Sequence, residues 1–293
     1  MDWKPGGVSD DVEDRRDSSG GGGGGGFSGM GFGAPHIGIG GMLLLLVLSL
    51  VFHRNLFTMF LGGSGADRPP AATYAPAATG DQGTEVQFVS FVLDDVQRTW
   101  QNLLPAQGGP QYRHAKLVLF RDSFDSACGE ADSATGPFYC PGDEKVYLDL
   151  GFFDELKSRF GAPGEFAQAY VIAHEIGHHV QKLLGIEGKV QRLRQSNPAQ
   201  ANPLSVRLEL QADCFAGVWA KSTEQRKIID QSDIAAGLRA AAAVGDDRLQ
   251  KMATGHVSPE SFTHGSSQQR MQWFQSGLDA GQISACDTFA AAR

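Results

Sequence analysis

The stretch YVIAHEIGHHVQKLL, residues 170–184, contains the motif H-E-x-x-H in His174, Glu175 and His178. Its dense apolar residues are typical of a largely buried helix, and Gly185 offers a stop. Residues four apart lie one above the other on a helix, so both histidines can direct a ring nitrogen at one ion. Glu175 would then lie beside that ion, where it could take a proton from water without being a ligand.

A second apolar helical pattern follows at residues 207–220, RLELQADCFAGVWA, with Glu209 and Asp213 four apart on one face. A buried acidic pair is costly unless it binds a metal or accepts hydrogen bonds. We therefore expect Glu209 to be the third metal ligand and Asp213 to accept the other ring N–H of a ligand histidine. His179 points about 100° away from the second ligand histidine, which favours a core or supporting role over ligation.

This pairing of H-E-x-x-H with E-x-x-A-D on a later helix resembles the gluzincin metallopeptidases, especially the membrane-associated group that contains the prenyl-protein processing and heat-shock proteases. From about residue 85 to residue 289, the chain is more closely similar to a bacterial family called putative neutral zinc metallopeptidases. The segments that carry this likeness are GPFYCPGDEKVYLDLGFF, HEIGHHVQ, ELQADCFAGVW and SFTHGSSQQRMQWF. The resemblance implies one catalytic Zn²⁺ and the hydrolysis of peptide bonds.

Residues 261–270, SFTHGSSQQR, resemble the T-H-x-x-x-x-x-R element near the C-terminus of membrane gluzincins. In those relatives the histidine faces the metal cleft. The resemblance implies that His264 donates a hydrogen bond to the oxyanion that develops at the substrate carbonyl. It also implies that Arg270 pairs with a buried acid, for which Asp213 is the obvious candidate. The alternative is that residues 263–265 form only the turn that begins a helix.

The remaining pattern predicts an α+β fold, a mostly helical zincin-like domain around a small sheet. Apolar periodicity predicts a helix over residues 86–103 that ends before Pro105. Further elements are expected as a strand at 116–121, a hairpin of 138–140 and 146–150, a short helix at 152–160, and two helices joined by a turn over 228–249. In zincins the strand before the metal helix pairs with extended substrate, and here that role falls to residues 136–150 unless they form an ordinary hairpin. The polar residues 188–203 are either a flap or a connector.

The first part of the chain differs in composition from the rest. Residues 1–36 are acidic and glycine-rich, which predicts a flexible disordered tail. Residues 37–61 are apolar enough for one transmembrane helix, and residues 62–84 read as a flexible linker to a metallopeptidase domain at 85–293. A cleaved signal peptide is a weaker alternative, because the segment before the apolar residues is too long for the amino-terminal region of a signal peptide and is net acidic. The lysine and arginine distribution gives a weak bias toward a cytoplasmic N-terminus.

The four cysteines are Cys128, Cys140, Cys214 and Cys286, and none forms C-x-x-C. We expect a local disulfide between Cys128 and Cys140, and a second between Cys214 and Cys286 that ties the C-terminus to the ligand helix. Three pairings are formally possible, and four free buried thiols are the alternative. Two disulfides would imply an oxidising compartment, so the catalytic domain is expected outside the cytoplasm, on the periplasmic side of the inner membrane.

The formal net charge of −8 gives no reason to expect nucleic acid as a partner. Together these patterns predict a membrane-anchored zinc metalloendopeptidase that acts on a peptide or protein substrate. Its Zn²⁺ would be held by His174, His178 and Glu209, with Glu175 as the general base. The rival hypothesis is a catalytically silent envelope scaffold that uses zinc only to hold its helices together. A metal-dependent hydrolase of non-peptide substrates is a weaker alternative.

Overall fold

A computed structural model of the chain describes residues 1–17, 81–132 and 136–290. The predicted transmembrane helix at 37–61 lies outside the described residues, as do residues 18–36 of the predicted tail and most of the predicted linker. The last residues of that linker, 81–84, instead belong to a helix. In the part of the chain that the structure describes, no helix is both long and apolar enough to cross a membrane.

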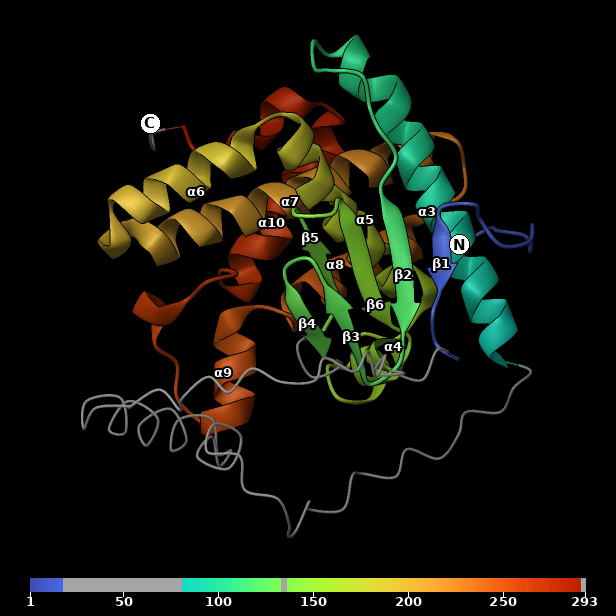
Figure 1. The fold of residues 1–293 in the computed structure, drawn as a ribbon, viewed down its shortest axis with the longest axis horizontal. Coiled ribbons are helices and arrows are strands. Elements are labelled where there is room, and N and C mark those ends of the chain that lie inside the picture. Colours follow the sequence, from blue (N-terminus) through green and yellow to red (C-terminus); the bar gives the residue numbers. More distant parts are fainter. Residues whose placement is uncertain (18–80, 133–135, 291–293) are drawn as a thin grey trace, which may run out of the picture. The chain divides into compact units, whose positions relative to one another are not determined.

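The described residues are mostly helical and include a small sheet, as the sequence predicts (Figure 1). The helices are α3 (Asp81–Ala106), α4 (Gly151–Ser158), α5 (Glu165–Leu183), α6 (Ile186–Ser196), α7 (Ala201–Gln225), α8 (Gln231–Ala243), α9 (Asp246–Thr254) and α10 (Ser267–Ala280). The strands are β1 (Val12–Asp14), β2 (Lys116–Phe120), β3 (Ser123–Ser126), β4 (Gly129–Asp132), β5 (Phe138–Cys140) and β6 (Lys145–Asp149).

The main sheet has the strand order β1-β2-β6-β5, in which β1, β2 and β6 run parallel and β5 runs antiparallel to β6. The predicted hairpin of β5 and β6 is therefore confirmed. Strand β5 is the last strand on its side of the sheet, and it contacts α5, the helix with the H-E-x-x-H motif. The Tyr139 hydroxyl of β5 lies 2.9 Å from Nδ1 of His179 on that helix.

Two local predictions were wrong, and one small sheet was missed. The polar residues 188–203 are largely helical, because they fall in α6 and at the start of α7. Helix α3 continues through Pro105 to Ala106, since a proline in the last turn removes only one backbone hydrogen bond. Strands β3 and β4 form a second, two-stranded sheet, for which no element was predicted. Both predicted disulfides, Cys128–Cys140 and Cys214–Cys286, are present.

The amino-terminal segment, residues 1–17, does not behave as the predicted flexible tail. Its strand β1 pairs with β2, with Val12 opposite Leu117. The Asp11 carboxylate accepts hydrogen bonds from Gln97 of α3 at 2.9 Å and from Lys116 of β2 at 2.7 Å. The α-amino group of Met1 pairs with an aspartate of α8 at 3.0 Å. Polar composition predicted disorder, but Asp11 and Glu13 meet a cation or an amide on the folded domain.

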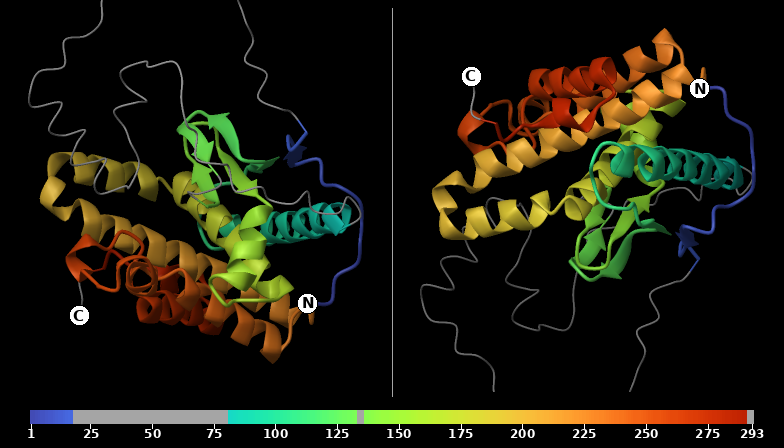
Figure 2. Two further views of the ribbon diagram at one scale, coloured as in Figure 1. Left: turned by 90° about the horizontal axis from the view of Figure 1, so that it is seen from below. Right: turned by 90° about the horizontal axis from the view of Figure 1, so that it is seen from above.

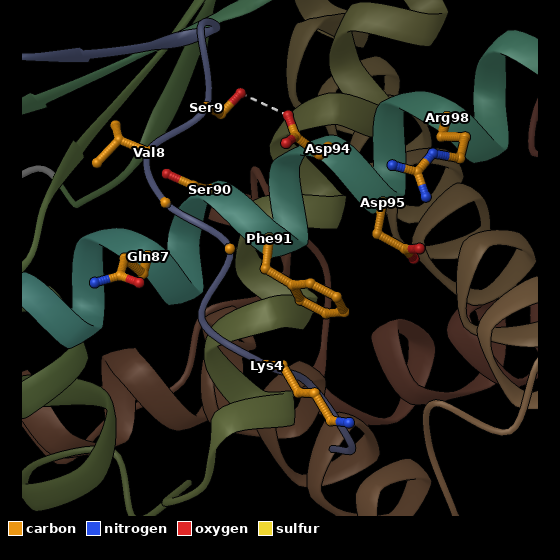
Figure 3. A pocket seen from close by; sticks show the side chains of 11 residues that line it. Lys4, Val8, Ser9, Gln87, Ser90, Phe91, Asp94, Asp95 and Arg98 are labelled. Atoms are coloured by element: carbon orange, nitrogen blue, oxygen red, sulfur yellow. Dashed lines mark hydrogen bonds between the residues drawn. The ribbon is translucent and has the colours of Figure 1, made fainter.

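Residues 4–9 of this segment run across α3 and enclose a cavity of about 130 Å³ with it (Figure 3). Ser9 bridges the two sides by donating a hydrogen bond to Asp94 of α3 at 2.5 Å. None of the predicted metal ligands lines this cavity. The amino-terminal segment therefore covers α3 and the sheet edge without occupying the predicted metal site.

Glycines allow the helices around that site to approach closely. A Cβ on Gly177 of α5 would lie 3.0 Å from the carbonyl oxygen of Ala212 on α7. A Cβ on Gly277 of α10 would lie 1.9 Å from the carbonyl oxygen of Cys214, also on α7. Helix α7 consequently packs between α5 and α10, and both views of Figure 2 place α7 and α10 side by side. This contact brings the acidic pair of α7 next to the histidines of α5.

Candidate metal centre

The structure brings His174 and His178 of α5 together with Glu209 of α7, so that one ligand atom of each lies within 4.8 Å of the others. Nε2 of His174 is 3.2 Å from one Glu209 carboxylate oxygen, and Nε2 of His178 is 3.5 Å from the other. Two imidazoles and one carboxylate are a known ligand set for catalytic Zn²⁺, which leaves a coordination position open. Within the described ranges, these residues form the single His, Cys, Asp and Glu group with such geometry.

His174 is supported by a buried charge network. Its Nδ1 lies 2.9 Å from the Asp213 carboxylate. Arg270 of α10 donates two hydrogen bonds to that carboxylate, at 2.8 and 2.9 Å. The Tyr170 hydroxyl also donates a hydrogen bond to Asp213. Because Nδ1 donates to Asp213, Nε2 presents its lone pair to the ligand group. These contacts are those expected for Asp213 and Arg270 from the sequence.

His178 is supported by a neutral network that the sequence analysis missed. Its Nδ1 lies 2.9 Å from the side-chain oxygen of Gln181. The Gln181 amide donates to the Leu208 carbonyl at 2.6 Å and to Gln211 at 3.1 Å, and Gln211 donates to the Cys286 carbonyl at 2.8 Å. The available signal was a glutamine three positions after His178, in a helix with many apolar residues. The chain of amides links this ligand to the Cys214–Cys286 disulfide.

The charges of the cluster favour a bound cation. Burial by itself would lower the pKa of His174, but Asp213 and Glu209 raise it to about 10. Burial would raise the pKa of Glu209, yet His178 and His174 hold it well below the usual value. The carboxylate is therefore negative and faces two nitrogens that carry protons in the absence of a metal. A divalent ion would take the place of that positive charge.

Glu175 lies on α5 beside the first ligand histidine and is buried, with 7% of its surface exposed. Burial raises the pKa of its carboxyl group, while the positive charges of His174 and His178 oppose the rise. A carboxylate with a raised pKa beside the ligands is suited to accept a proton from water. Glu175 is not part of the ligand group.

His179 and His264 take different positions. His179 uses both ring nitrogens for hydrogen bonds, to the Tyr139 hydroxyl and to the Arg113 carbonyl at 2.7 Å, so neither is available for an ion. His264 has a half-exposed side chain in the loop before α10. Its Nδ1 lies 3.2 Å from Asp246, which was not singled out in the sequence. His264 is not among the ligands, and its loop packs against α7 beside Glu209.

Comparison with known proteins gives matches that include the residues of the candidate metal centre. The sequence profile of a family described as "Putative neutral zinc metallopeptidase" matches residues 1–289. The chain is 45% identical over 292 residues to "Uncharacterized protein YpfJ" of Escherichia coli (strain K12), with 99% of each chain covered. It is 45% identical over 210 residues to "Uncharacterized protein Rv2575" of Mycobacterium tuberculosis (strain ATCC 25618 / H37Rv), covering 68% of this chain and 69% of the relative. No solved structure matches.

Proposed function

The chain belongs to the family of putative neutral zinc metallopeptidases, and on this premise we propose that it is a zinc-dependent peptidase that hydrolyses bonds in a peptide or protein substrate. One observation carries the proposal. The H-E-x-x-H histidines meet Glu209 within 4.8 Å, while the remaining acid of the motif, Glu175, stays outside the ligand group. A purely structural zinc site would not need a buried, non-ligating carboxylate beside its ligands.

In the proposed mechanism, each residue of the site has a separate role in hydrolysis. Zn²⁺, when bound, supplies a Lewis acid that polarises the substrate carbonyl and makes water more acidic. Glu175 accepts the proton of the attacking water and passes it to the leaving amine. His264, which lies in the loop that packs against α7 and has its imidazole next to Asp246, donates a hydrogen bond to the oxyanion that develops on the carbonyl. Asp213 and Gln181 hold the ligand histidines in the tautomer that binds metal.

The substrate class is supported by the sheet. Strand β5 lies at the edge of the main sheet and contacts the metal helix. An extended peptide can add to such an edge through main-chain hydrogen bonds, which are independent of sequence. This arrangement would place a peptide bond next to the ligand group. A non-peptide substrate would gain nothing from the unpaired strand edge.

We further propose that the enzyme acts outside the cytoplasm at the inner membrane, held there by the apolar residues 37–61. Two disulfides within one domain support an oxidising compartment, because cytosolic thiols are kept reduced. The Cys214–Cys286 disulfide also ties the C-terminal residues to α7, which carries Glu209. The domain with the metal centre is therefore expected on the periplasmic side.

The test of the proposed function is the Glu175→Gln variant. Glutamine keeps the shape and burial of the side chain but cannot accept the proton, so zinc content and melting temperature should stay unchanged. Hydrolysis of an unstructured protein such as casein should fall by several orders of magnitude. Glu155→Gln, a change on α4 outside the metal centre, is the matched control and should keep full activity. Retained hydrolysis in purified Glu175→Gln protein would overturn the proposal, and a wild-type protein that binds zinc but cleaves nothing would favour the scaffold hypothesis.

A further inference from the structure

One buried carboxylate holds the loop that carries His264. Oδ2 of Asp246 accepts the backbone N–H groups of Thr263 at 2.7 Å, His264 at 2.7 Å and Gly265 at 3.0 Å. Nδ1 of the His264 ring lies 3.2 Å from Oδ1 of the same carboxylate and 3.0 Å from the Thr263 hydroxyl oxygen. The backbone N–H of Asp246 donates to the Gly265 carbonyl at 2.9 Å. The same side chain thus fixes both the backbone of this loop and one nitrogen of the imidazole.

The loop lies against the helix that supplies the third ligand. A Cβ on Gly265 would lie 3.2 Å from Leu210 and 3.3 Å from Val206, the side chains that flank Glu209 on α7. Gly265 has a φ of +93°, a conformation that favours glycine, so the chain can turn here without leaving α7. The charged groups that act on the His264 ring are Asp246 of α9, Glu209 of α7 and Arg270 of α10. The loop that carries the ring therefore lies against α7, next to the residue proposed as the third ligand.

We propose that Asp246 is a positioning residue of the peptidase, which fixes the His264 imidazole so that its Nε2–H is aimed at the oxyanion of the substrate. Because Asp246 accepts a hydrogen bond from Nδ1–H, the other ring nitrogen, Nε2, faces away from this carboxylate. The negative charge of Asp246 also favours the imidazolium form, in which Nε2 carries a proton. This inference rests on the proposed peptidase function. After Asp213, Asp246 would be a second acid that orients a histidine, 18 residues before His264.

The neighbouring Asp247 provides a matched comparison. It also accepts hydrogen bonds at the start of the next helix, from the backbone N–H of Ser267 at 2.7 Å and from the Ser267 hydroxyl at 2.8 Å. Among the described residues, its carboxylate makes no hydrogen bond or ion pair with His264. If Asp246 served only to hold the turn before α10, then loss of either carboxylate should have similar effects. If Asp246 acts through the imidazole, then only Asp246 should be coupled to His264.

The experiment compares Asp246→Asn, His264→Ala, the double variant and Asp247→Asn, all zinc-loaded. Asp246→Asn should lower kcat by about 10- to 100-fold, with KM and zinc content nearly unchanged. Its alkaline limb in the pH profile should move to lower pH, because the imidazole loses its negative partner. In the His264→Ala background, the same substitution should cost less than about 2-fold. Asp247→Asn should leave kcat and the pH profile as in the wild type. Equal losses from Asp246→Asn in both backgrounds would overturn the proposal.

A second measurement does not depend on catalysis, and it leaves Asp246 and His264 unchanged. In zinc-loaded Glu175→Gln protein, ¹⁵N NMR of His264 should show a neutral form with the proton on Nδ1 and a pKa above the usual value. Burial opposes this rise, and Asp246 is its principal cause. A neutral form protonated on Nε2 would overturn the positioning role even if hydrolysis is confirmed. If hydrolysis is absent in the wild type while the Nδ1 tautomer is found, the proposed function fails and the orientation of His264 by Asp246 still stands.

Discussion

The two ligand histidines differ in the group that holds their second ring nitrogen. His174 donates to Asp213, an anion that is itself paired with Arg270, whereas His178 donates to the neutral amide of Gln181. A negative partner makes an imidazole a stronger metal ligand than a neutral partner does. We therefore expect His174 to contribute more to the metal affinity than His178 does.

The third ligand can be tested by zinc affinity. Glu209→Ala should lower zinc occupancy sharply, because its carboxylate faces Nε2 of both histidines. Asp213→Ala removes a supporting partner only, so affinity should fall by about 10- to 100-fold. Competition with a chromophoric chelator measures both values, and Glu187→Ala on α6 is the control. Full and tight zinc binding by Glu209→Ala would assign the third ligand to another residue.

The protonation of His174 predicts how stability depends on pH. In the metal-free protein, burial lowers the pKa of His174 but Asp213 and Glu209 raise it from 6.5 to about 10. The stabilising effect of this proton is full below about pH 6.5 and is lost as the pH rises toward about 10. Urea unfolding of chelator-treated protein should therefore show a fall in free energy of unfolding from about pH 6.5 to 9.5. The extra stability given by zinc should grow over the same range, because metal competes with the proton. A pH-independent difference between the two forms would contradict this prediction.

The sequence could predict which residues meet at the candidate metal centre because their spacing is local. H-E-x-x-H and E-x-x-A-D each place two side chains on one face of one helix, and burial then restricts what the acids can do. Asp246 and Gln211 could not be found in this way. Each is polar in a helix like many others, and its role depends on a contact with a residue distant in the chain, His264 or Gln181.

At the scale of elements, the contact between α7 and α10 depends on glycines that face the partner backbone. A Cβ on Gly277 would lie 1.9 Å from the carbonyl oxygen of Cys214, and a Cβ on Gly217 would lie 2.0 Å from that of Phe274. Any side chain must push the helices apart. Since α7 carries Glu209 and α10 carries Arg270, such a shift would also disturb the support of the metal centre.

Gly277→Ala should therefore destabilise the protein by about 3 kcal/mol or more, as overpacking against backbone cannot relax locally. Gly188→Ala is the matched control on α6, where the added methyl would meet only the end of a flexible arginine at 3.7 Å. Helix propensity predicts that this control gains about 1 kcal/mol. Denaturant unfolding of both variants gives the comparison. Equal stabilities would show that the α7 and α10 contact is looser than the structure indicates.

The elements themselves were predictable to different degrees. Long apolar periodicity gave α3, α5 and α7, and a Pro-Gly-Asp turn gave the hairpin of β5 and β6. Strand β1 was missed because its three residues, Val12, Glu13 and Asp14, contain two acids. It is held by main-chain pairing and by partners such as Lys145, which lies 2.8 Å from Glu13. Such long-range ion pairs leave no periodic signal in the sequence.

At the scale of the whole molecule, the amino-terminal segment constrains the arrangement at a membrane. Residues 1–17 pair with β2 and contact α3, so they belong to the same folded unit as the metal centre. A helix that crossed a membrane once between these two parts would place them in different compartments. The weak charge bias for a cytoplasmic N-terminus therefore conflicts with strand β1. A folded β1 requires residues 1–17 on the same side as residues 81–290.

Cysteine labelling tests this requirement. Val8 is 59% exposed in the amino-terminal segment and Leu193 is 51% exposed on α6, and all four native cysteines are in disulfides. Val8→Cys and Leu193→Cys should therefore react equally with a membrane-impermeant maleimide in spheroplasts, and the wild type should not react. Permeabilised cells give the full labelling of each variant. If only Leu193→Cys reacts in sealed spheroplasts, β1 is not paired in the membrane-bound protein and a single crossing is supported. If both react, the metal centre and the N-terminus share the periplasmic side, which is the side proposed for the domain from its disulfides.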